Sequence, residues 1–341
     1  MTRPGLRPNC WNGVLTFRPQ MKGDRSSCAV DPSKNPLSPS LSLDSSPTPA
    51  LPTTPQMNDL PSWVVQYPSA FMNRLPSSRD VRNNPEEMKS FFEYYNATID
   101  EQKEGSDGEN VDVIEHFFWG LKYGVALELG SSDGSVQEGS MTYELQQKLK
   151  WNRILIEADP AYRGNMKIRS PNTYAINAAI CQVKDHHHVV HYAYKGRFGG
   201  ILEFMSEEYL KKYTPEVYKA GSPPGNVSSI QDWSKIRQAT STVKCLPLSK
   251  VLSFAHVYHV NFLLLSVNGA EFEVLQTFNF EKVTIDVLCI ETDSSFRPIG
   301  FAEKIIDFMR VKGYEVQTQI GKNHCKICFF EFISLSLQHC S

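Results

Sequence analysis

The sequence lacks a long hydrophobic run, an excess of either charge and a secretory leader. No window reaches the about 18 apolar residues of a membrane span, and the longest apolar runs, Val260–Val267 and Ile327–Leu337, have the length of strands. Met1–Val30 contains no apolar run of the about 7 to 15 residues that a signal peptide needs. Lys and Arg number 35 against 37 Asp and Glu, so the charge signature of a nucleic-acid-binding protein is absent. We therefore expect neither a membrane nor a nucleic acid as a partner.

The eight cysteines are scattered and form no regular framework. Cys181 and Cys289 lie in apolar, strand-like runs, where reduced buried thiols are expected. This spacing argues against disulfides and favours a cytoplasmic location. The pair Cys325 and Cys328 has no second pair to complete a zinc site, and the consecutive histidines in Asp185–His188 point in different directions. We predict no metal site.

Proline is concentrated at the start of the chain, where 11 of the 21 prolines lie at or before Pro61, interleaved with Ser and Thr. Such a segment buries too little apolar surface to offset the entropy of ordering it. We predict a disordered leader over residues 1–60, a helical and loop extension over 61–110, and one α/β domain over 111–341.

Apolar runs alternate with amphipathic segments in the rest of the chain. The predicted strands are Val125–Leu129, Ile154–Ala158, Tyr174–Cys181, Val189–Tyr194, Phe262–Ser266 and Val287–Glu291. The predicted helices are Pro85–Asn96, Val111–Leu121, Met141–Lys150, Ala161–Arg169, Leu248–Phe254, Ala270–Phe278 and Ala302–Lys312. Continuous apolar strands separated by helices indicate a doubly wound, mostly parallel sheet. Ligands of such sheets bind outside the carboxyl ends of the strands, so function is expected there.

A glycine-containing turn follows the first strand. It reads Glu128-Leu-Gly130-Ser131-Ser-Asp133-Gly134, in which Gly130 permits a tight turn and a close approach of backbone to ligand. It lacks the three glycines of the dinucleotide fingerprint. Glu128 lies two residues before Gly130, an arrangement that suits a cationic, amino-acid-bearing cofactor. Glu128, Gly130, Ser131, Asp133 and Gly134 are the predicted cofactor-binding residues of this turn.

The next strand ends in two acids, Glu157 and Asp159. A carboxylate at this position accepts both hydrogen bonds from the vicinal diol of an unphosphorylated ribose. Glu157 is the better candidate for that role, because Asp159 stands where it would cap the following helix. With the Glu128 turn, the pair predicts a nucleoside site.

A third block, Ser266-Val-Asn268-Gly269-Ala-Glu271, follows the Phe262 strand. Together, Glu128–Gly134, Leu155–Pro160, Cys245–Leu248 and Gly269–Leu275 resemble the FkbM-type methyltransferases in order and spacing. The resemblance extends over about Glu115 to Ile320. It implies a class I Rossmann-like fold, S-adenosylmethionine as cofactor, and O-methylation of a hydroxyl on a sugar or another small metabolite, so that a small molecule or a glycan is the acceptor.

The chain departs from the family at two acids. Members usually read Asp-Val-Glu-Gly-Ala-Glu, whereas Ser266 and Asn268 are neutral here. An alcohol must lose a proton when it is methylated, which calls for a base near the oxygen. The predicted catalytic residues are Ser266, Asn268 and the remaining acid Glu271, and Glu291 with Asp293 at the next strand end could substitute for the missing carboxylates.

Several alternatives stay open from the sequence. The chain could be a methyltransferase-fold binding protein that has lost catalysis at Ser266 and Asn268, or a nicotinamide-dependent oxidoreductase. His256 or His259 could act as the base. Aromatic residues between Phe198 and Tyr218 could line the acceptor pocket or simply pack in the core; they are Phe198, Phe204, Tyr209, Tyr213 and Tyr218.

Overall fold

The computed structural model describes residues 60–68, 71, 75, 77–102, 113–169, 172–182, 189–194, 198–219, 240–292, 300–320 and 326–331. All of the predicted leader except residue 60 lies outside the described residues, so its disorder stays a prediction. The histidines at 186–188, Asp293, Cys325 and the C-terminal residues 332–341 also lie outside them.

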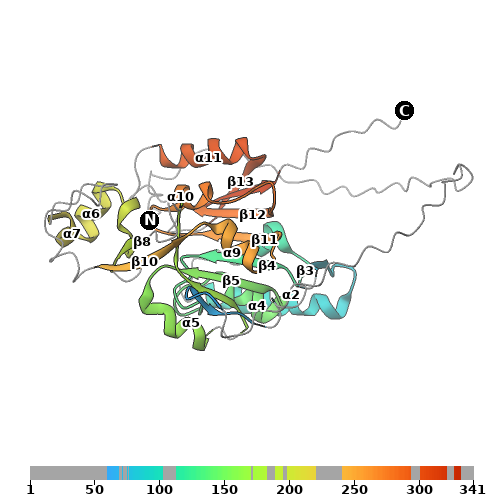
Figure 1. The fold of residues 1–341 in the computed structure, drawn as a ribbon. Helices are drawn as coiled ribbons and strands as arrows, with labels where there is room; N and C mark the ends of the chain where they lie inside the picture. The colour runs from blue at the N-terminus through green and yellow to red at the C-terminus, as the bar shows by residue number, and fades with distance from the viewer. Residues whose placement is uncertain are drawn as a thin grey trace, which may run out of the picture. The chain divides into compact units, whose positions relative to one another are not determined.

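The described strands form a central sheet of eight. Its order is β1 (Val64–Gln66), β6 (Tyr174–Asn177), β5 (Asn152–Glu157), β4 (Val125–Leu129), β11 (His259–Leu265), β12 (Thr284–Glu291), β14 (Lys326–Glu331) and β13 (Tyr314–Ile320) (Figure 1). The five strands from β6 to β12 run parallel, whereas the pairs β1–β6, β12–β14 and β13–β14 are antiparallel. The predicted mostly parallel, doubly wound sheet is therefore confirmed. The strand order reverses between β4 and β11, where a ligand site is expected.

Both faces of this sheet are covered, as the apolar runs predict. Every residue of β11 from Val260 to Leu265 is buried. Phe262 and Leu264 face a cluster that also contains residues of three helical segments, α2 (Pro85–Gln102), η2 (Ile114–Phe118) and α4 (Tyr143–Leu149). Successive residues of a strand point to opposite faces, so the continuous apolar run Phe262–Leu265 requires cover on both sides.

The helix predicted over Val111–Leu121 is shorter than expected. It is the single π-helical stretch η2, and the chain turns at Gly120, whose φ is +84°. The next two residues form β3 (Leu121–Lys122), which pairs with β2 (Arg79–Asp80). A left-handed glycine ends the helix where the apolar pattern alone would continue it.

The strand predicted over Tyr174–Cys181 is divided between two sheets. Its first half is β6, and its second half, β7 (Ala179–Ile180), begins a four-stranded sheet with β10 (Thr240–Leu246), β8 (Val189–Ala193) and β9 (Gly200–Ile201). The short helices η5 (Leu202–Phe204), α6 (Glu207–Tyr213) and α7 (Pro215–Lys219) follow β9, and Figure 1 shows α6 and α7 near β8 and β10, away from α2 and α4. This second sheet supplies one wall of the site described below.

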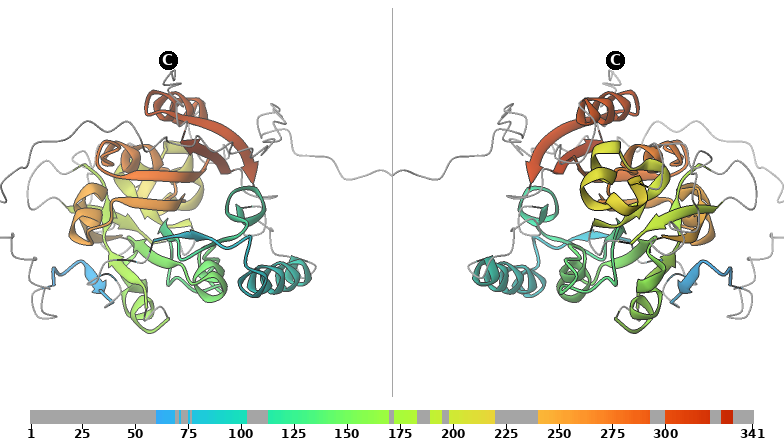
Figure 2. Two further views of the ribbon diagram at one scale, coloured as in Figure 1. Left: turned by 90° about the vertical axis from the view of Figure 1, so that its right-hand side faces the viewer. Right: turned by 90° about the vertical axis from the view of Figure 1, so that its left-hand side faces the viewer.

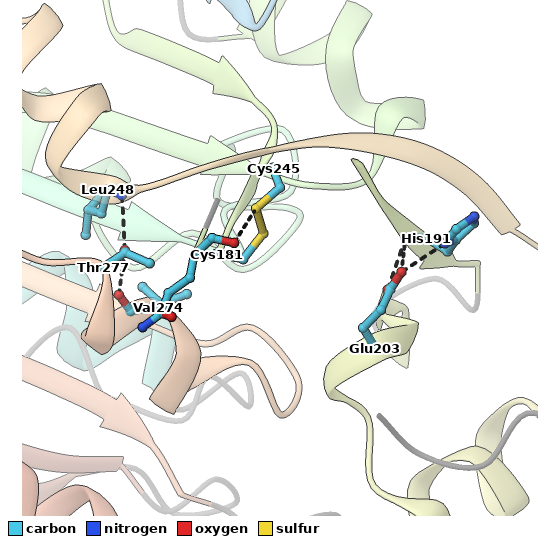
Figure 3. Close-up of a disulfide and its surroundings, with 8 residues drawn as sticks. Cys181, His191, Glu203, Cys245, Leu248, Val274 and Thr277 are labelled. Carbon is cyan, nitrogen blue, oxygen red and sulfur yellow. Dashed lines mark hydrogen bonds and ion pairs between the residues drawn. A yellow bond between two sulfur atoms is a disulfide. The ribbon is translucent and has the colours of Figure 1, made fainter. Parts of the chain in front are cut away.

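Two strands of the second sheet are joined by a disulfide between Cys181 and Cys245 (Figure 3). β7 and β10 are parallel neighbours, with Cys245 opposite Ala179, and the Cα atoms of the two cysteines lie 5.7 Å apart. That separation is usual for a disulfide. The predicted reduced thiol at Cys181 is therefore wrong, and Cys289 is disulfide-bonded as well. The sequence separation of 64 between Cys181 and Cys245 conceals their proximity.

The remaining helices agree with the predicted pattern within a few residues. They are η3 (Pro160–Tyr162), α5 (Arg163–Arg169), α9 (Leu248–Phe254), α10 (Glu271–Gln276) and α11 (Phe301–Val311). α11 packs against β13 (Figure 2). Within the described part of the chain, no helix has the length and apolar character needed to cross a membrane. The cytoplasmic location stays a prediction.

Candidate active site

A cavity of about 570 Å³ opens at the carboxyl ends of the central strands. Its floor includes Gly130 after β4, Glu157 at the end of β5, Ser266 after β11 and Glu291 at the end of β12. The opposite wall comes from the second sheet and from α6. The volume lies within the range of about 300–1,000 Å³ that is usual for small-molecule sites.

Gly130 allows the β4 turn to lie directly against β11. Its φ is +78°, and a Cβ at this position would come within 1.8 Å of the Ser266 carbonyl oxygen. The Ser266 amide donates to the Leu129 carbonyl oxygen at 3.2 Å, which joins the two strand ends. Gly130 and Ser132 line the cavity, whereas the predicted residues Ser131, Asp133 and Gly134 are not among the described residues that line it.

Glu128 is not among the described residues that line the cavity, and its carboxylate holds the loop before α4. Its carboxylate accepts hydrogen bonds from the Ser140 hydroxyl at 2.7 Å, the Met141 amide at 3.2 Å and the Thr142 hydroxyl. Arg153 lies 3.7 Å from the same carboxylate, and both side chains are almost completely buried. A buried charge must be paired and hydrogen-bonded, and this network meets that requirement. The described contacts of Glu128 are therefore structural, and its cofactor-binding role stays a prediction.

Glu157 lies in the cavity wall. Its Oε2 accepts a hydrogen bond from the Ser132 amide at 2.8 Å, and its Oε1 accepts one from the Asp159 amide at 2.7 Å. Burial raises the pKa of the Glu157 carboxyl to about 7, although these backbone hydrogen bonds oppose the shift. Asp159 caps η3 through the Ala161 amide at 2.8 Å, as its position in the sequence predicts.

Ser266 and Glu291 form a hydrogen-bonded pair across two strand ends. The register of β11 and β12 places Leu265 beside Ile290, so the next residues, Ser266 and Glu291, are adjacent. The Ser266 hydroxyl donates to Glu291 Oε2, and both residues line the cavity. Of the two acids expected to substitute for the missing family carboxylates, Glu291 therefore lines the cavity, and Asp293 lies outside the described residues.

Asn268 and Glu271 have different surroundings, although both belong to the same predicted block. Asn268 lines the cavity, and its Nδ2 donates to the Gly199 carbonyl oxygen at 2.7 Å, which ties the β11–α10 turn to the loop before β9. Glu271 is fully buried; its carboxylate accepts hydrogen bonds from the Val267 amide at 3.1 Å and the Gly269 amide at 3.0 Å. Glu271 thus closes the turn and is not among the described cavity-lining residues.

Two of the five aromatic residues considered from the sequence line the cavity. Phe198 and Tyr213 lie in the cavity wall with their rings stacked 4.6 Å apart at 18°. Tyr209 is buried and donates to the Phe198 carbonyl oxygen at 2.6 Å, and Tyr218 donates to Glu207 at 2.9 Å. Phe204 packs against the apolar cluster of the second sheet.

Sequence reasoning missed Tyr192, Lys212 and Glu138, which also line the cavity. Glu138 lies in the loop after β4, nine residues beyond the strand end, whereas Tyr192 lies in β8 and Lys212 in α6. No local motif distinguishes them from surface or core residues. Burial raises the pKa of the Tyr192 hydroxyl, so that hydroxyl remains protonated at neutral pH. It can donate a hydrogen bond there but cannot serve as a base.

The two histidines considered as bases lie elsewhere. His259 is the first residue of β11, at the opposite end from Ser266, and its Nε2 lies 2.7 Å from Asp286 Oδ1. His256 is in the turn before that strand, with a φ of +54°. Among the residues with described positions, no group of three His, Cys, Asp or Glu side chains is arranged to hold a metal ion.

Comparisons with known proteins give one family and several distant structures. One is fibrillarin from Aeropyrum pernix in complex with natively bound S-adenosyl-L-methionine, which is 9% identical to this chain, with a TM-score of 0.29. The match covers 61% of this chain and 66% of the fibrillarin chain, so this chain spans just under two thirds of that protein. A SAM-dependent methyltransferase from Aquifex aeolicus is 13% identical with a TM-score of 0.31, and the match covers 69% of this chain and 96% of that one.

No curated protein matches the sequence. Residues 128–316, more than half of the chain, match the methyltransferase FkbM domain. This segment begins at the Glu128 turn and includes Glu157, Ser266 and Glu291, the residues that end the central strands. The chain therefore belongs to the FkbM methyltransferase domain family.

Proposed function

We propose that this protein is an S-adenosylmethionine-dependent O-methyltransferase that acts on a hydroxyl of a sugar or another small molecule. The observation that carries the proposal is the cavity at the switch point of the sheet, with the Gly130 turn and the Glu157 carboxylate in its wall. A small-molecule or glycan acceptor suits a cavity of this size. The proposal requires neither a nucleic acid nor a membrane as partner.

The residues of the wall fit the cofactor. Gly130 lets the β4 turn lie directly against Ser266, and its backbone lines the cavity, where it is accessible to a ligand. The Glu157 carboxylate accepts one backbone hydrogen bond on each oxygen, and each oxygen has further acceptor capacity for the hydroxyls of a ribose diol. When bound, S-adenosylmethionine would supply an electrophilic methyl group on a positively charged sulfur. Gly130, Ser132 and Glu157 would hold its nucleoside part.

The other half of the cavity suits a hydroxylated acceptor. The stacked rings of Phe198 and Tyr213 offer an apolar surface for the C–H face of a sugar or for an aromatic ring. Asn268 fastens this wall to the sheet edge through Gly199. Much of the acceleration of a methyl transfer comes from holding the acceptor oxygen in line with the methyl group, and a wall fixed in this way would provide that orientation.

A thermal-shift comparison tests the cofactor. We expect S-adenosylmethionine and S-adenosylhomocysteine to raise the Tm, since a ligand that binds only the folded state at about 100 times its Kd adds about 2.7 kcal/mol of stability. Reduced nicotinamide cofactors should leave the Tm unchanged. A shift with the nicotinamide cofactors alone would reject the proposal in favour of an oxidoreductase.

Transfer of a labelled methyl group to a panel of monosaccharides and phenols then tests the reaction. We expect incorporation into at least one hydroxylated compound, with the label lost when Glu157 is replaced by Gln. Cofactor binding without transfer to any member of a broad panel would favour the binding protein that lacks catalysis.

A further inference from the structure

Three carboxylates line the cavity among the residues whose positions are described: Glu138, Glu157 and Glu291. Glu138 accepts a hydrogen bond from the Tyr162 hydroxyl at 3.0 Å, on the β5 side of the site. Glu157 accepts two backbone amides, also at the end of β5. Glu291 stands at the end of β12, beside the β11 end and on the other side of the switch point.

Glu291 is nearly buried, with an exposed fraction of 8%. What is exposed faces the cavity, because the residue is part of its lining. Its carboxylate accepts a hydrogen bond from the Ser266 hydroxyl, and the Ser266 backbone is held to β4 through its amide. This side-chain hydrogen bond from an anchored serine orients the carboxylate. A group held in this way is prepared for chemistry, since little reorganisation is needed when a substrate binds.

We propose that Glu291 is the residue that takes the proton from the acceptor hydroxyl, and that Ser266 is its positioning residue. This inference rests on the proposed function. The acceptor O–H bond breaks with the proton passing to the Glu291 carboxylate, while the acceptor oxygen forms a bond to the methyl carbon. The carbon–sulfur bond breaks at the same time, and its electron pair stays on sulfur, which becomes neutral.

The same geometry accounts for the serine at position 266. An aspartate there would place a second carboxylate against Glu291, and two like charges in contact disfavour ionisation. A serine instead donates a hydrogen bond to the carboxylate. Loss of the family acid at position 266 is therefore compatible with catalysis, because Glu291 at the end of β12 supplies a carboxylate at the same place.

The test compares the affinities of S-adenosylmethionine and S-adenosylhomocysteine by calorimetry. The two ligands differ by a methyl group and by the positive charge on sulfur, so a carboxylate near the transferred methyl favours the charged ligand. For Glu291→Gln we expect the preference for S-adenosylmethionine, expressed as the ratio of the two Kd values, to fall about five- to tenfold relative to the wild type. A loss of fold would weaken both ligands together and leave this ratio unchanged.

Glu138→Gln is the matched control, because it removes a carboxylate from the same cavity on the β5 side. We expect its ratio to stay within about twofold of the wild type. Ser266→Ala should lower the ratio less than Glu291→Gln, and the double variant should match Glu291→Gln alone, since Ser266 acts through Glu291.

An unchanged ratio in a Glu291→Gln variant that binds S-adenosylhomocysteine as tightly as the wild type, or an equal fall in Glu138→Gln, would overturn the assignment of Glu291. Additive effects of the Ser266 and Glu291 variants would overturn the positioning role of Ser266. A wild-type protein that binds neither ligand rejects the proposed function itself, so the two failures are distinguishable.

Discussion

Among single residues, Glu157 has the most unusual environment in the cavity. Burial makes the charged carboxylate costly, and the amides of Ser132 and Asp159 only partly offset that cost, so the pKa rises to about 7. The carboxylate is therefore half protonated near neutral pH. A protonated carboxyl is a weaker acceptor than a carboxylate for the hydroxyls of a ribose.

This environment predicts a pH-dependent affinity for adenosine, which carries the diol but has no group that titrates near neutrality. The carboxylate form predominates above pH 7, so the affinity should fall several-fold as the pH is lowered from 8 to 6, and Glu157→Gln should abolish this dependence. We expect 2′-deoxyadenosine to bind about tenfold more weakly than adenosine at pH 8. Calorimetry at both pH values measures these affinities. Equal binding of the two nucleosides would show that Glu157 does not contact the diol.

The carboxylates show how far a single residue can be assigned from its place in the sequence. Glu128, Glu157, Glu271 and Glu291 all lie at or just beyond the end of a central strand. Position alone cannot say which of them faces the cavity. Contacts with residues distant in the sequence orient each carboxylate. Arg153 and the 140–142 loop hold Glu128, and Ser266 holds Glu291.

The turn after β4 is the element on which the site depends most. Gly130 and Gly139 both have positive φ and both line the cavity, but only Gly130 touches another strand end. A Cβ on Gly130 would collide with the Ser266 backbone, whereas a Cβ on Gly139 meets nothing within 4 Å. Substitutions at the two glycines therefore distinguish two energetic costs. Both positions have the cost of a left-handed backbone, and only Gly130 adds the cost of a steric clash.

Gly130→Ala should be far more destabilising than Gly139→Ala. Each substitution carries the about 1–2 kcal/mol of a left-handed alanine, and Gly130→Ala must in addition push β4 away from β11. We expect the free energy of unfolding of Gly130→Ala, measured by urea denaturation, to be at least about 2 kcal/mol lower than that of Gly139→Ala. Equal values for the two variants would contradict the close approach of the two strand ends.

Elements were predictable where their apolar pattern is local. β4 and α9 have the predicted bounds, and β5, β11 and β12 differ from the predicted ones by a few residues at their ends. β10 was not predicted, because Thr240-Ser-Thr-Val-Lys-Cys-Leu246 alternates polar and apolar residues without a continuous apolar run. The first part of the C-terminal apolar run Ile327–Leu337 lies in β14, between β12 and β13, and the rest of the run lies outside the described residues.

At the scale of the whole molecule, two sheets enclose one cavity. The central sheet supplies Gly130, Glu157, Ser266 and Glu291, and the second sheet supplies Ile180, Tyr192 and Ile201. The Cys181–Cys245 disulfide lies in the apolar cluster that contains Tyr192 and Ile201. It therefore stabilises the second sheet directly behind the cavity wall.

Removing this disulfide should lower the stability of the protein. A crosslink across 64 residues restricts the unfolded chain, and its loss costs about 2–4 kcal/mol. We expect Cys181→Ala, Cys245→Ala and the double variant to have similarly lowered Tm values in the absence of reductant, since each lacks the same bond. Scanning calorimetry measures the Tm. A double variant as stable as the wild type would show that the bond contributes no net stability.

Local patterns in the sequence predict the alternation of strands and helices, the parallel sheet, the family and the strand ends that line the cavity. These features can be predicted because an apolar run buried on both faces and a glycine in a tight turn are recognisable from a few consecutive residues. Only the tertiary structure decided which carboxylates reach the cavity, that Cys181 is bonded to Cys245, and that Asn268 holds Gly199. Those facts depend on contacts between residues far apart in the chain, which no local pattern encodes.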